Sequence, residues 1–387
     1  MIKLKKDIWK TAKLGEICEI NMGKTPSRNN LANFGKGYTW LSIADFKGDK
    51  YLSKSKEEIT DFALTQARFK PIKQNTLLLT FKLTIGKIAI AGKELYTNEA
   101  IAALPIKNEK VITTDFLYTI LQTIDYDSKT DKAVKGATLN KEKLTHLSFP
   151  LPPLEEQKQI AALFQSIETA MEQVDGQEKN LKALQKSLVN GLLSKEPEFG
   201  NLLNIKKCIA TTFGEIAECD KKYPEHEKEV ERFVGLEWIE ADNFQLQGFG
   251  LVANGTTFTK RFVKGDVLFG KRRAYLKKVA VADFDGICSG DILVIRAKAK
   301  KMLQGLLPYY ISADAFINHA VSTSAGSLSP RTKWKDLAEL EVSIPDIKTQ
   351  STILEVLQQL DNTVNQLKQQ KITLKNLKQK LLNEILG

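Results

Sequence analysis

A stretch of about 40 residues that begins with a proline occurs twice in the chain, and its second copy starts 193 residues after the first. The copies begin at Pro152 and Pro345, and in each a glutamine follows five residues later, Gln157 or Gln350. Apolar residues then recur at every seventh position. These positions are Ile160, Ile167, Val174, Leu181 and Leu188 in the first copy and Ile353, Leu360, Leu367, Leu374 and Leu381 in the second. A sustained repeat of seven predicts a long helix that packs against another helix.

Each predicted helix has about 35 residues and would extend about 50 Å at 1.5 Å per residue. This length exceeds one side of a compact domain, so we expect the two helices to pair with each other, in either orientation. Two long helices within one ordinary domain are the alternative, but the shared phase of the copies favours a duplicated architecture. The predicted segments are a globular domain at 1–150, a helix at 151–195, a second globular domain at 196–343 and a C-terminal helix at 344–387.

The globular segments mix strand and helix patterns, which predicts an α+β protein with two mixed α/β domains and two long helices in a pseudo-two-fold repeat. In the first segment, alternating or apolar runs bounded by glycine and proline predict strands. The expected strands are Leu14–Ile20, Tyr38–Ile43, Thr76–Phe81 and Lys87–Ala91, with a helix at Asp115–Leu121 and a turn at Lys135–Asn140.

The second globular segment repeats landmarks of the first in the same order. The corresponding pairs are Phe213–Ile216 with Leu14–Ile17, Arg232–Ile239 with the strand at Trp40, Val267–Val281 with the strands around Gly86, and Ala325–Ser329 with Gly136–Asn140. The chain is therefore one globular–helix unit repeated twice, and the globular halves differ more than the helices do. If each half binds something, the two halves bind different things.

The net charge of the 387 residues is +11, and residues 1–149 alone carry +9. An excess of this size favours a polyanionic partner, although a generally lysine-rich composition would give the same number. The four cysteines form no C-x-x-C pair and the chain has three histidines, so neither a zinc site nor a disulfide framework is expected. No apolar run approaches 18 residues, so we expect no membrane span and a cytoplasmic protein with buried thiols.

No motif in the chain indicates a catalytic site. Gly23-Lys24-Thr25 lacks the earlier glycine of a phosphate-binding loop, and no glycine-rich turn suggests a dinucleotide or S-adenosylmethionine site. His146, His226 and His319 have no nucleophile pattern beside them. We therefore assign no catalytic residue, no cofactor-binding residue and no metal ligand.

Basic and hydroxylic residues are concentrated on the predicted turns. Lysine and hydroxyl groups suit phosphates, and arginine can pair with guanine through two hydrogen bonds, whereas solvated surface charge is the alternative for any single residue. The candidate DNA-binding residues are Lys24, Thr25, Ser27, Arg28, Lys82, Thr84, Lys87, Lys135, Thr138, Lys271, Arg272, Arg273, Tyr275, Ser327, Ser329 and Arg331. The densest group is Lys271–Tyr275.

Three stretches resemble the specificity subunits of type I restriction-modification systems. Leu151–Gln157, which reads Leu-Pro-Pro-Leu-Glu-Glu-Gln, opens the first long helix, and Asp266–Lys271 and Phe284–Asp291 are similar to stretches of the target-recognition domains of that family. The resemblance also covers the order of segments along the whole chain. The second helix departs from it at its start, because Pro345–Gln350 contains neither glutamate.

The resemblance implies a non-enzymatic subunit in which each target-recognition domain binds one half of a bipartite double-stranded DNA site. The helices would form an antiparallel coiled coil that fixes the spacer and docks two modification subunits, which restriction subunits then join. S-adenosylmethionine and ATP would belong to those partners, and this chain would hold no cofactor. Two alternatives stay open: a coiled-coil adaptor whose basic domains bind RNA or protein, and an enzyme with an unrecognised site.

Overall fold

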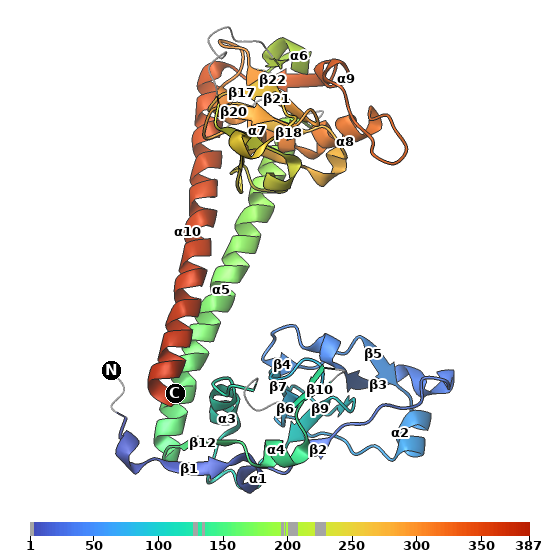
Figure 1. Ribbon diagram of the computed structural model, residues 1–387, viewed down its shortest axis with the longest axis vertical. Coiled ribbons are helices and arrows are strands. Elements are labelled where there is room, and N and C mark those ends of the chain that lie inside the picture. Colours follow the sequence, from blue (N-terminus) through green and yellow to red (C-terminus); the bar gives the residue numbers. More distant parts are fainter. Residues whose placement is uncertain are drawn as a thin grey trace. The chain divides into compact units, whose positions relative to one another are not determined.

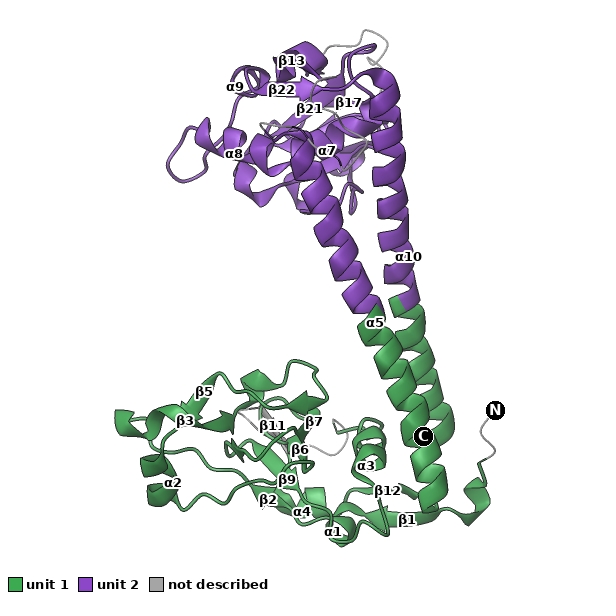
Figure 2. Cartoon of the chain, turned by 180° about the vertical axis from the view of Figure 1, so that it is seen from behind, with its two compact units in different colours: residues 1–173, 371–387 green, residues 174–370 purple. Residues whose placement is uncertain are grey.

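The computed structural model describes residues 4–126, 131–133, 136–194, 197, 199, 208–220 and 230–387. It divides into two compact units, which Figure 2 shows in different colours. Unit 1 comprises Met1–Gln173 and Lys371–Gly387, and unit 2 comprises Val174–Gln370. The division crosses both long helices, so each unit holds one mixed α/β domain and a part of each helix.

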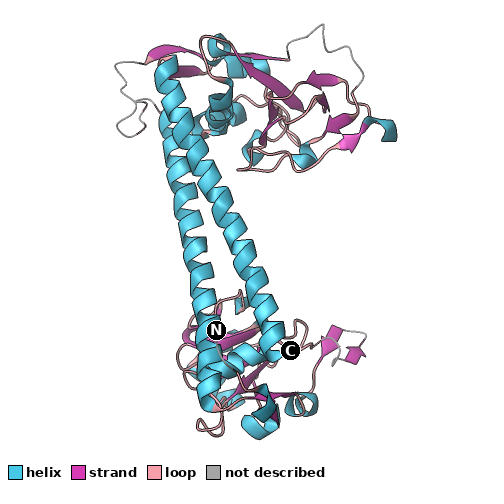
Figure 3. Ribbon diagram, turned by 90° about the vertical axis from the view of Figure 1, so that its left-hand side faces the viewer, coloured by secondary structure: helices cyan, strands magenta, loops and turns pink. Residues whose placement is uncertain are grey.

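The repeated heptad stretches form the two longest helices, α5 (Leu154–Leu192) and α10 (Ile347–Leu386), which Figure 3 shows in cyan. A proline precedes each helix, where its missing N–H costs nothing. Asp346 caps the start of α10, because its carboxylate accepts the Thr349 N–H at 3.1 Å and the Thr349 hydroxyl at 2.9 Å. These hydrogen bonds hold the pKa of Asp346 below its usual range. Within the described residues, every helix is too short or too polar to span a bilayer.

The two helices pair in opposite directions within each unit. In unit 1, Ile160 and Ile167 of α5 share a buried cluster with Leu382 of α10. In unit 2, the buried cluster includes Leu192 of α5 and Ile353 of α10. Polar pairs follow the same antiparallel register: Lys378 Nζ lies 2.6 Å from Glu168 Oε1 in unit 1, and Gln185 Nε2 donates to Asp361 Oδ1 at 2.7 Å in unit 2.

The apolar heptad positions lie at the protected faces of these helices. Five of the ten predicted pairing residues are buried and five are half-buried. The buried ones are Ile160, Ile167, Val174, Ile353 and Leu367, and the half-buried ones are Leu181, Leu188, Leu360, Leu374 and Leu381. Leu184, which the wider apolar stripe would also include, is 48% exposed. The protected stripe is wider near the start of each helix, where Phe164 and Leu357 are also buried, than at Leu184.

The domain of unit 1 is built on two sheets, and Figure 1 labels most of their strands. The five-stranded sheet has the order β2-β9-β6-β7-β4 and the three-stranded sheet the order β5-β3-β8. The strands are β2 (Asn21–Met22), β3 (Phe34–Leu41), β4 (Tyr51–Leu52), β5 (Glu57–Ile59), β6 (Leu77–Thr80), β7 (Ile88–Ala91), β8 (Tyr96–Thr97) and β9 (Ile101–Leu104), and the helices are α1 (Leu14–Ile17), α2 (Asp61–Ala67), α3 (Thr114–Leu121) and α4 (Lys141–Thr145).

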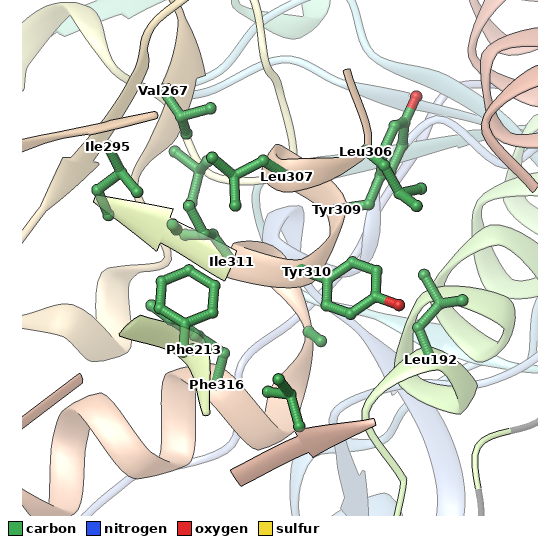
Figure 4. Packing of buried hydrophobic residues seen from close by; sticks show 14 of the residues in the cluster. Leu192, Phe213, Val267, Ile295, Leu306, Leu307, Tyr309, Tyr310, Ile311 and Phe316 are labelled. Atoms are coloured by element: carbon green, nitrogen blue, oxygen red, sulfur yellow. The ribbon is translucent and has the colours of Figure 1, made fainter. Parts of the chain in front are cut away.

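The domain of unit 2 has the same plan, with four-stranded sheets ordered β14-β21-β18-β19 and β16-β15-β20-β17. The strands are β14 (Ala217–Cys219), β15 (Arg232–Val234), β16 (Gly250–Leu251), β17 (Lys260–Phe262), β18 (Val267–Gly270), β19 (Val279–Val281), β20 (Gly286–Cys288) and β21 (Ile292–Ala297), and the helices are α6 (Phe213–Ile216), α7 (Leu307–Ser312), α8 (Asp314–Ser322) and α9 (Trp334–Ala338). Figure 4 shows its core, in which Phe213 and Phe316 meet edge to face with ring centroids 4.9 Å apart.

Strand pairing confirms the internal repeat for the central strands of the two domains. In unit 1, β6 lies between β7 and β9, and in unit 2 β18 lies between β19 and β21, each time with both neighbours antiparallel. The parallel pairs β3–β8 and β15–β20 also correspond. At the base of each domain a two-stranded ladder precedes the long helix, β1 (Lys10–Lys13) with β12 (Ser148–Leu151) and β13 (Ile209–Thr212) with β22 (Glu341–Ile344).

The structure corrects two local predictions. The strand expected over Leu14–Ile20 begins instead as the short helix α1, because Leu14 and Ile17, three residues apart, are both buried on one side of a helical turn. The turn expected over Lys135–Asn140 contains the strand β11 (Gly136–Thr138), which pairs with β10 (Asp131–Ala133) as a hairpin. Lys135 itself lies outside the described residues.

The match of Ala325–Ser329 to Gly136–Asn140 is also shifted. The Leu139 N–H donates to the Phe81 carbonyl at 3.0 Å just beyond β6, and the Thr332 N–H donates to the Lys271 carbonyl at 3.1 Å just beyond β18. Leu139 and Thr332 are therefore equivalent, and they are separated by the same 193 residues that separate the two long helices. The predicted match missed this because a short loop offers few landmarks for alignment.

Candidate nucleic-acid interface

In unit 2, the chain leaves β18 into a tight basic loop. Arg273 and Lys277 have φ angles of 53° and 52°, and the 3-10 turn η9 (Ala274–Leu276) lies between them. Left-handed backbone is unfavourable for side chains larger than glycine, so the loop must be held by its surroundings. Ala274 is buried and anchors it, whereas Tyr275 is exposed. The loop therefore presents its polar side chains on a fixed backbone.

A second loop, predicted separately from the sequence, packs onto this one. The Arg273 N–H donates to the Pro330 carbonyl at 2.8 Å, and Arg272 and Arg331 form an antiparallel bridge. The structure thus joins two candidate groups into one, which we call the cationic loop cluster. The cluster consists of Lys271, Arg272, Arg273, Tyr275, Ser327, Ser329, Arg331 and Asp291.

Asp291 lies at the centre of the cluster. Its carboxylate accepts from Arg331 Nε at 2.6 Å and Nη2 at 3.1 Å, and lies 3.7 Å from Arg272 Nη1. The Arg331 hydrogen bond holds the pKa of Asp291 below its usual range, and Arg272 contributes in the same direction. Asp291 is itself fixed, since its N–H donates to Ser289 Oγ at 3.2 Å and its carbonyl accepts from the Lys271 N–H at 2.9 Å.

The pairing of Arg331 with Asp291 uses one edge of the guanidinium and leaves the other edge largely available to a ligand. A guanidinium has two edges that can each form a two-point contact. Asp291 occupies the Nε–Nη2 edge, and on the Nη1–Nη2 edge Nη1 donates to the Ser329 carbonyl at 3.3 Å. The Arg331 side chain is 46% exposed. It is therefore held in one orientation while keeping the fork that matches guanine O6 and N7.

The other arginines of the cluster are held less tightly. Arg272 donates from Nε and Nη2 to Ser329 Oγ at 3.3 and 3.1 Å, so its fork is partly used. Arg273 is exposed and its Nη2 donates to the Leu328 carbonyl at 3.4 Å. Leu328 is 88% exposed at the tip of the second loop. With one carboxylate among four cations, the cluster carries a net positive charge.

In unit 1, the loop after β6 has the same backbone character. Leu83 has a φ of 63° and stands where Arg273 stands in unit 2, and its side chain is 72% exposed. Lys82 lies with Nζ 5.4 Å from the centre of the Phe81 ring, Thr84 is exposed, and Lys87 Nζ donates to the Phe46 carbonyl at 2.9 Å. Of the late pair, Lys135 is outside the described residues and Thr138 ends strand β11.

The loop that begins at Lys24 is tied to the protein itself. Arg28 makes a two-point contact with Glu57 from Nη1 and Nη2, at 2.8 and 2.9 Å, and its guanidinium lies 4.4 Å from the centre of the Phe34 ring. The Arg28 hydrogen bond holds the pKa of Glu57 below its usual range. Lys24 Nζ donates to the Ala67 carbonyl at 2.9 Å, Thr25 donates to Glu99, and Ser27 is exposed.

Sequence reasoning missed the acidic partners. Asp291 and Glu57 orient arginines in the two domains, yet neither was a candidate because acidic residues are not expected to face a polyanion. The available signal was the position of Asp291 directly after Gly290, between two strands and within a stretch already noted for its family resemblance. A carboxylate on such a turn is well placed to support a basic side chain on the next loop.

The metal-ligating and thiol groups of the domains can be described directly. Among the residues that the structure describes, no group of three side chains could hold a metal ion. None of the four cysteines is in a disulfide, and Cys18 and Cys288 are buried. Burial raises the pKa of both thiols to about 12, so neither forms a nucleophilic thiolate near neutral pH. Cys208 and Cys219 are half-buried, so the expectation of buried thiols is met by two of the four.

Comparison with known proteins identifies the family. The family model described as the type I restriction modification DNA specificity domain matches residues 6–183 and 211–376, one match for each half of the repeat. The chain belongs to this family. Specificity subunits of type I systems are not catalytic, so the chain is a non-enzymatic subunit, in agreement with the absence of a catalytic motif from its sequence.

Individual relatives agree with this family. The type I restriction enzyme EcoDI specificity subunit of Escherichia coli is 24% identical over 398 residues, which cover 91% of this chain and 81% of that protein. The MjaIX specificity subunit of Methanocaldococcus jannaschii is 26% identical over 201 residues, 50% of this chain and 46% of that subunit. The crystal structure of the type I system S subunit from M. genitalium has the same fold, with a TM-score of 0.59 and 15% identity over 100% of this chain and 98% of that one.

Proposed function

We propose that each domain of this chain reads one half of a bipartite double-stranded DNA site and that the paired helices set the distance between the halves. The observation that carries this proposal is the duplicated domain, whose two copies keep one scaffold and differ in the side chains on their loops. In unit 2 the loop after β18 presents Lys271, Arg272 and Arg273, and the equivalent loop in unit 1 presents Lys82, Leu83 and Thr84. Different loops on one scaffold suit two different half-sites.

The cationic loop cluster supports DNA as the ligand. Its lysine and arginines provide charge for phosphates, which gives affinity without sequence information. Arg331 adds a held and half-exposed guanidinium fork, which is the arrangement that distinguishes guanine from other bases. An RNA-binding or protein-binding adaptor could use the same fork on phosphates or carboxylates, but it predicts no sequence-specific binding to duplex DNA.

The long helices would also be the docking surface for two modification subunits, with restriction subunits joining the assembly. One face of each helix is protected in the helix pair, and the charged and amide side chains of the other faces stay exposed along the length of α5 and α10. S-adenosylmethionine and ATP would bind to those partners, because this sequence contains no motif for either. The chain would supply recognition and geometry, and the partners would supply chemistry.

Mapping of DNA methylation tests the proposal. In cells that hold the partner modification subunit, we expect a bipartite methylated motif with a fixed spacer when this gene is present, and loss of that motif when the gene is deleted. The motif would give both half-sites and the spacer in one experiment. A methylation pattern that is the same with and without the gene would contradict DNA recognition and favour the adaptor.

A further inference from the structure

The start of each long helix contains a fully buried glutamine. Gln157 in α5 and Gln350 in α10 are both 0% exposed, and they are the two side chains that the repeated sequence keeps between its proline and its first heptad residue. A buried amide is costly unless its oxygen and nitrogen are hydrogen-bonded. The contacts of each amide therefore show what the repeat preserves.

In unit 1, the Gln157 amide is fully used and joins two parts of the chain. Its Oε1 accepts from the Thr113 N–H at 3.1 Å, and its Nε2 donates to the carbonyls of Val111 and Pro152, both at 2.9 Å. Pro152 lies just before α5, whereas Val111 and Thr113 belong to the domain. The amide thus ties the first turn of the long helix to residues more than 40 positions earlier.

In unit 2, Gln350 makes the same three hydrogen bonds. Its Oε1 accepts from the Leu303 N–H at 2.9 Å, and its Nε2 donates to the carbonyls of Lys301 and Pro345, both at 2.9 Å. The donors and acceptors correspond one to one with those of Gln157, although the surrounding sequences differ. The same three hydrogen bonds occur in both copies of the repeat, although the residues around them differ. The hydrogen-bond arrangement itself has therefore been retained between the copies.

Each amide is hydrogen-bonded to a segment that continues directly into a helix, and this helix packs on the central sheet of its domain. Thr113 is the N-cap of α3, since its Oγ1 accepts from the Phe116 N–H at 3.2 Å, and α3 packs on β6 and β7. Leu303 is the N-cap of η10 (Gln304–Leu306), which continues into α7, and α7 packs on β18 and β19. The loops with the candidate DNA-binding residues extend from these same strands. Each glutamine therefore connects a long helix with the body that holds the recognition loops.

We propose that Gln157 and Gln350 are spacing determinants: each fixes the angle of its recognition domain on the long helix, so that a single spacer length is accepted. The inference rests on the proposed function. The joint between each domain and its long helix must be rigid for this purpose. A domain of about 150 residues has a radius of gyration of about 15 Å, so over a 30 Å arm a rotation of about 7° displaces the loops by one base-pair rise of about 3.4 Å.

The test uses the complete complex with Gln157→Met, which keeps the side-chain volume and removes all three hydrogen bonds. Methylation is measured on duplexes that carry both half-sites at the native spacing and at one base pair more or less. We expect the ratio of off-spacing to native methylation to rise at least roughly tenfold, because the loss of one or two of the three buried hydrogen bonds already corresponds to that factor. Base preference within each half-site should be unchanged. Gln350→Met should act in the same way from the other domain.

Gln159→Ala is the matched control, because Gln159 is an exposed glutamine in the same turn of α5. It should keep the native spacing preference. A Gln157→Met complex that assembles, melts at a lower temperature and keeps an unchanged spacing preference would overturn the inference and leave a stabilising role alone. A wild-type complex that methylates no bipartite site would instead overturn the proposed function, so the two failures are distinguishable. If Gln157→Met does not assemble, Gln350→Met decides the outcome.

Discussion

Replacing Arg331 with alanine should remove discrimination at one base pair of one half-site. Arg331 is held by Asp291 through Nε and Nη2. Its other edge, Nη1–Nη2, is the one that would contact two acceptors on a base edge, and there Nη1 exchanges its 3.3 Å hydrogen bond to the Ser329 carbonyl for the base. A good two-point contact of this kind is worth about 1–3 kcal/mol of discrimination. This corresponds to a roughly 5- to 150-fold preference for the correct base, since 1.4 kcal/mol is about tenfold.

The substitution should leave the fold intact. Without Arg331, the Asp291 carboxylate keeps Arg272 at 3.7 Å and keeps the hydrogen bonds of its own backbone, so no charge is left buried without a partner. Arg331 is itself exposed, and the loss of an exposed ion pair usually lowers the free energy of unfolding by about 0.2–1 kcal/mol. The effect on recognition should therefore be separable from stability.

The assay is a set of duplexes in which each base pair of one half-site is changed in turn, with methylation by the complete complex as the readout. We expect Arg331→Ala to reduce the rate on the native site and to equalise the rates on duplexes that differ at one position only. The other half-site and the spacer should respond as in the wild type. Lys348→Ala removes an exposed charge at the start of α10, outside the cationic loop cluster, and serves as the control.

A uniform loss would refute the reasoning. If Arg331 contacts a phosphate, its removal should weaken binding to all sequences alike and lower the slope of log affinity against log salt by about 1. If binding weakens uniformly and the base preferences stay unchanged, Arg331 does not contact a base. A loss of discrimination in both half-sites together would contradict the assignment of one half-site to each domain.

Three further outcomes follow from the structure. Asp291→Ala should release Arg331 and relax discrimination at the same base pair without weakening overall affinity, as measured on the same duplexes. Leu192→Ala should lower the free energy of unfolding by about 2–5 kcal/mol because Leu192 is fully buried, whereas Leu184→Ala, at an exposed site, should change it by about 0.5 kcal/mol or less in denaturant titrations. In thiol modification at pH 8, Cys208 should react before Cys18, whose pKa burial raises to about 12; equal rates would contradict the buried environment.

Periodicity along the chain predicts the architecture at the level of the repeat. The heptads that start at Ile160 and Ile353 predict two long helices that pair, and the constant interval between the copies predicts two equivalent domains. Both inferences rest on periodicity along the chain, which depends on helix geometry and not on distant contacts. The absence of catalytic motifs is likewise a property of the sequence alone, because such motifs depend on residue types at short spacing.

The predictions from local sequence patterns were wrong where contacts with the rest of the domain determine the secondary structure. Leu14–Ile20 alternates like a strand, but Leu14 and Ile17 are buried together on one turn of helix α1. The hairpin strand β11 was expected to be a turn, because glycine and a short polar run are typical of turns and the partner strand that stabilises it cannot be identified from the segment alone. The heptad pattern alone left the direction of helix pairing open, whereas the family resemblance implied an antiparallel pair. The apolar clusters within each unit confirm the antiparallel direction, because they join the start of one helix to the end of the other.

Tertiary structure alone decided how the candidate residues are grouped. Arg272 and Arg331 are almost 60 residues apart in sequence, yet they meet at one carboxylate, and no local pattern predicts that contact. It also divided the predicted cations into those held by the protein, such as Arg28 on Glu57, and those that keep a usable edge, such as Arg331. The physical reason is that hydrogen-bond geometry depends on distances of a few ångströms between loops, and these distances are set by the packing of whole sheets.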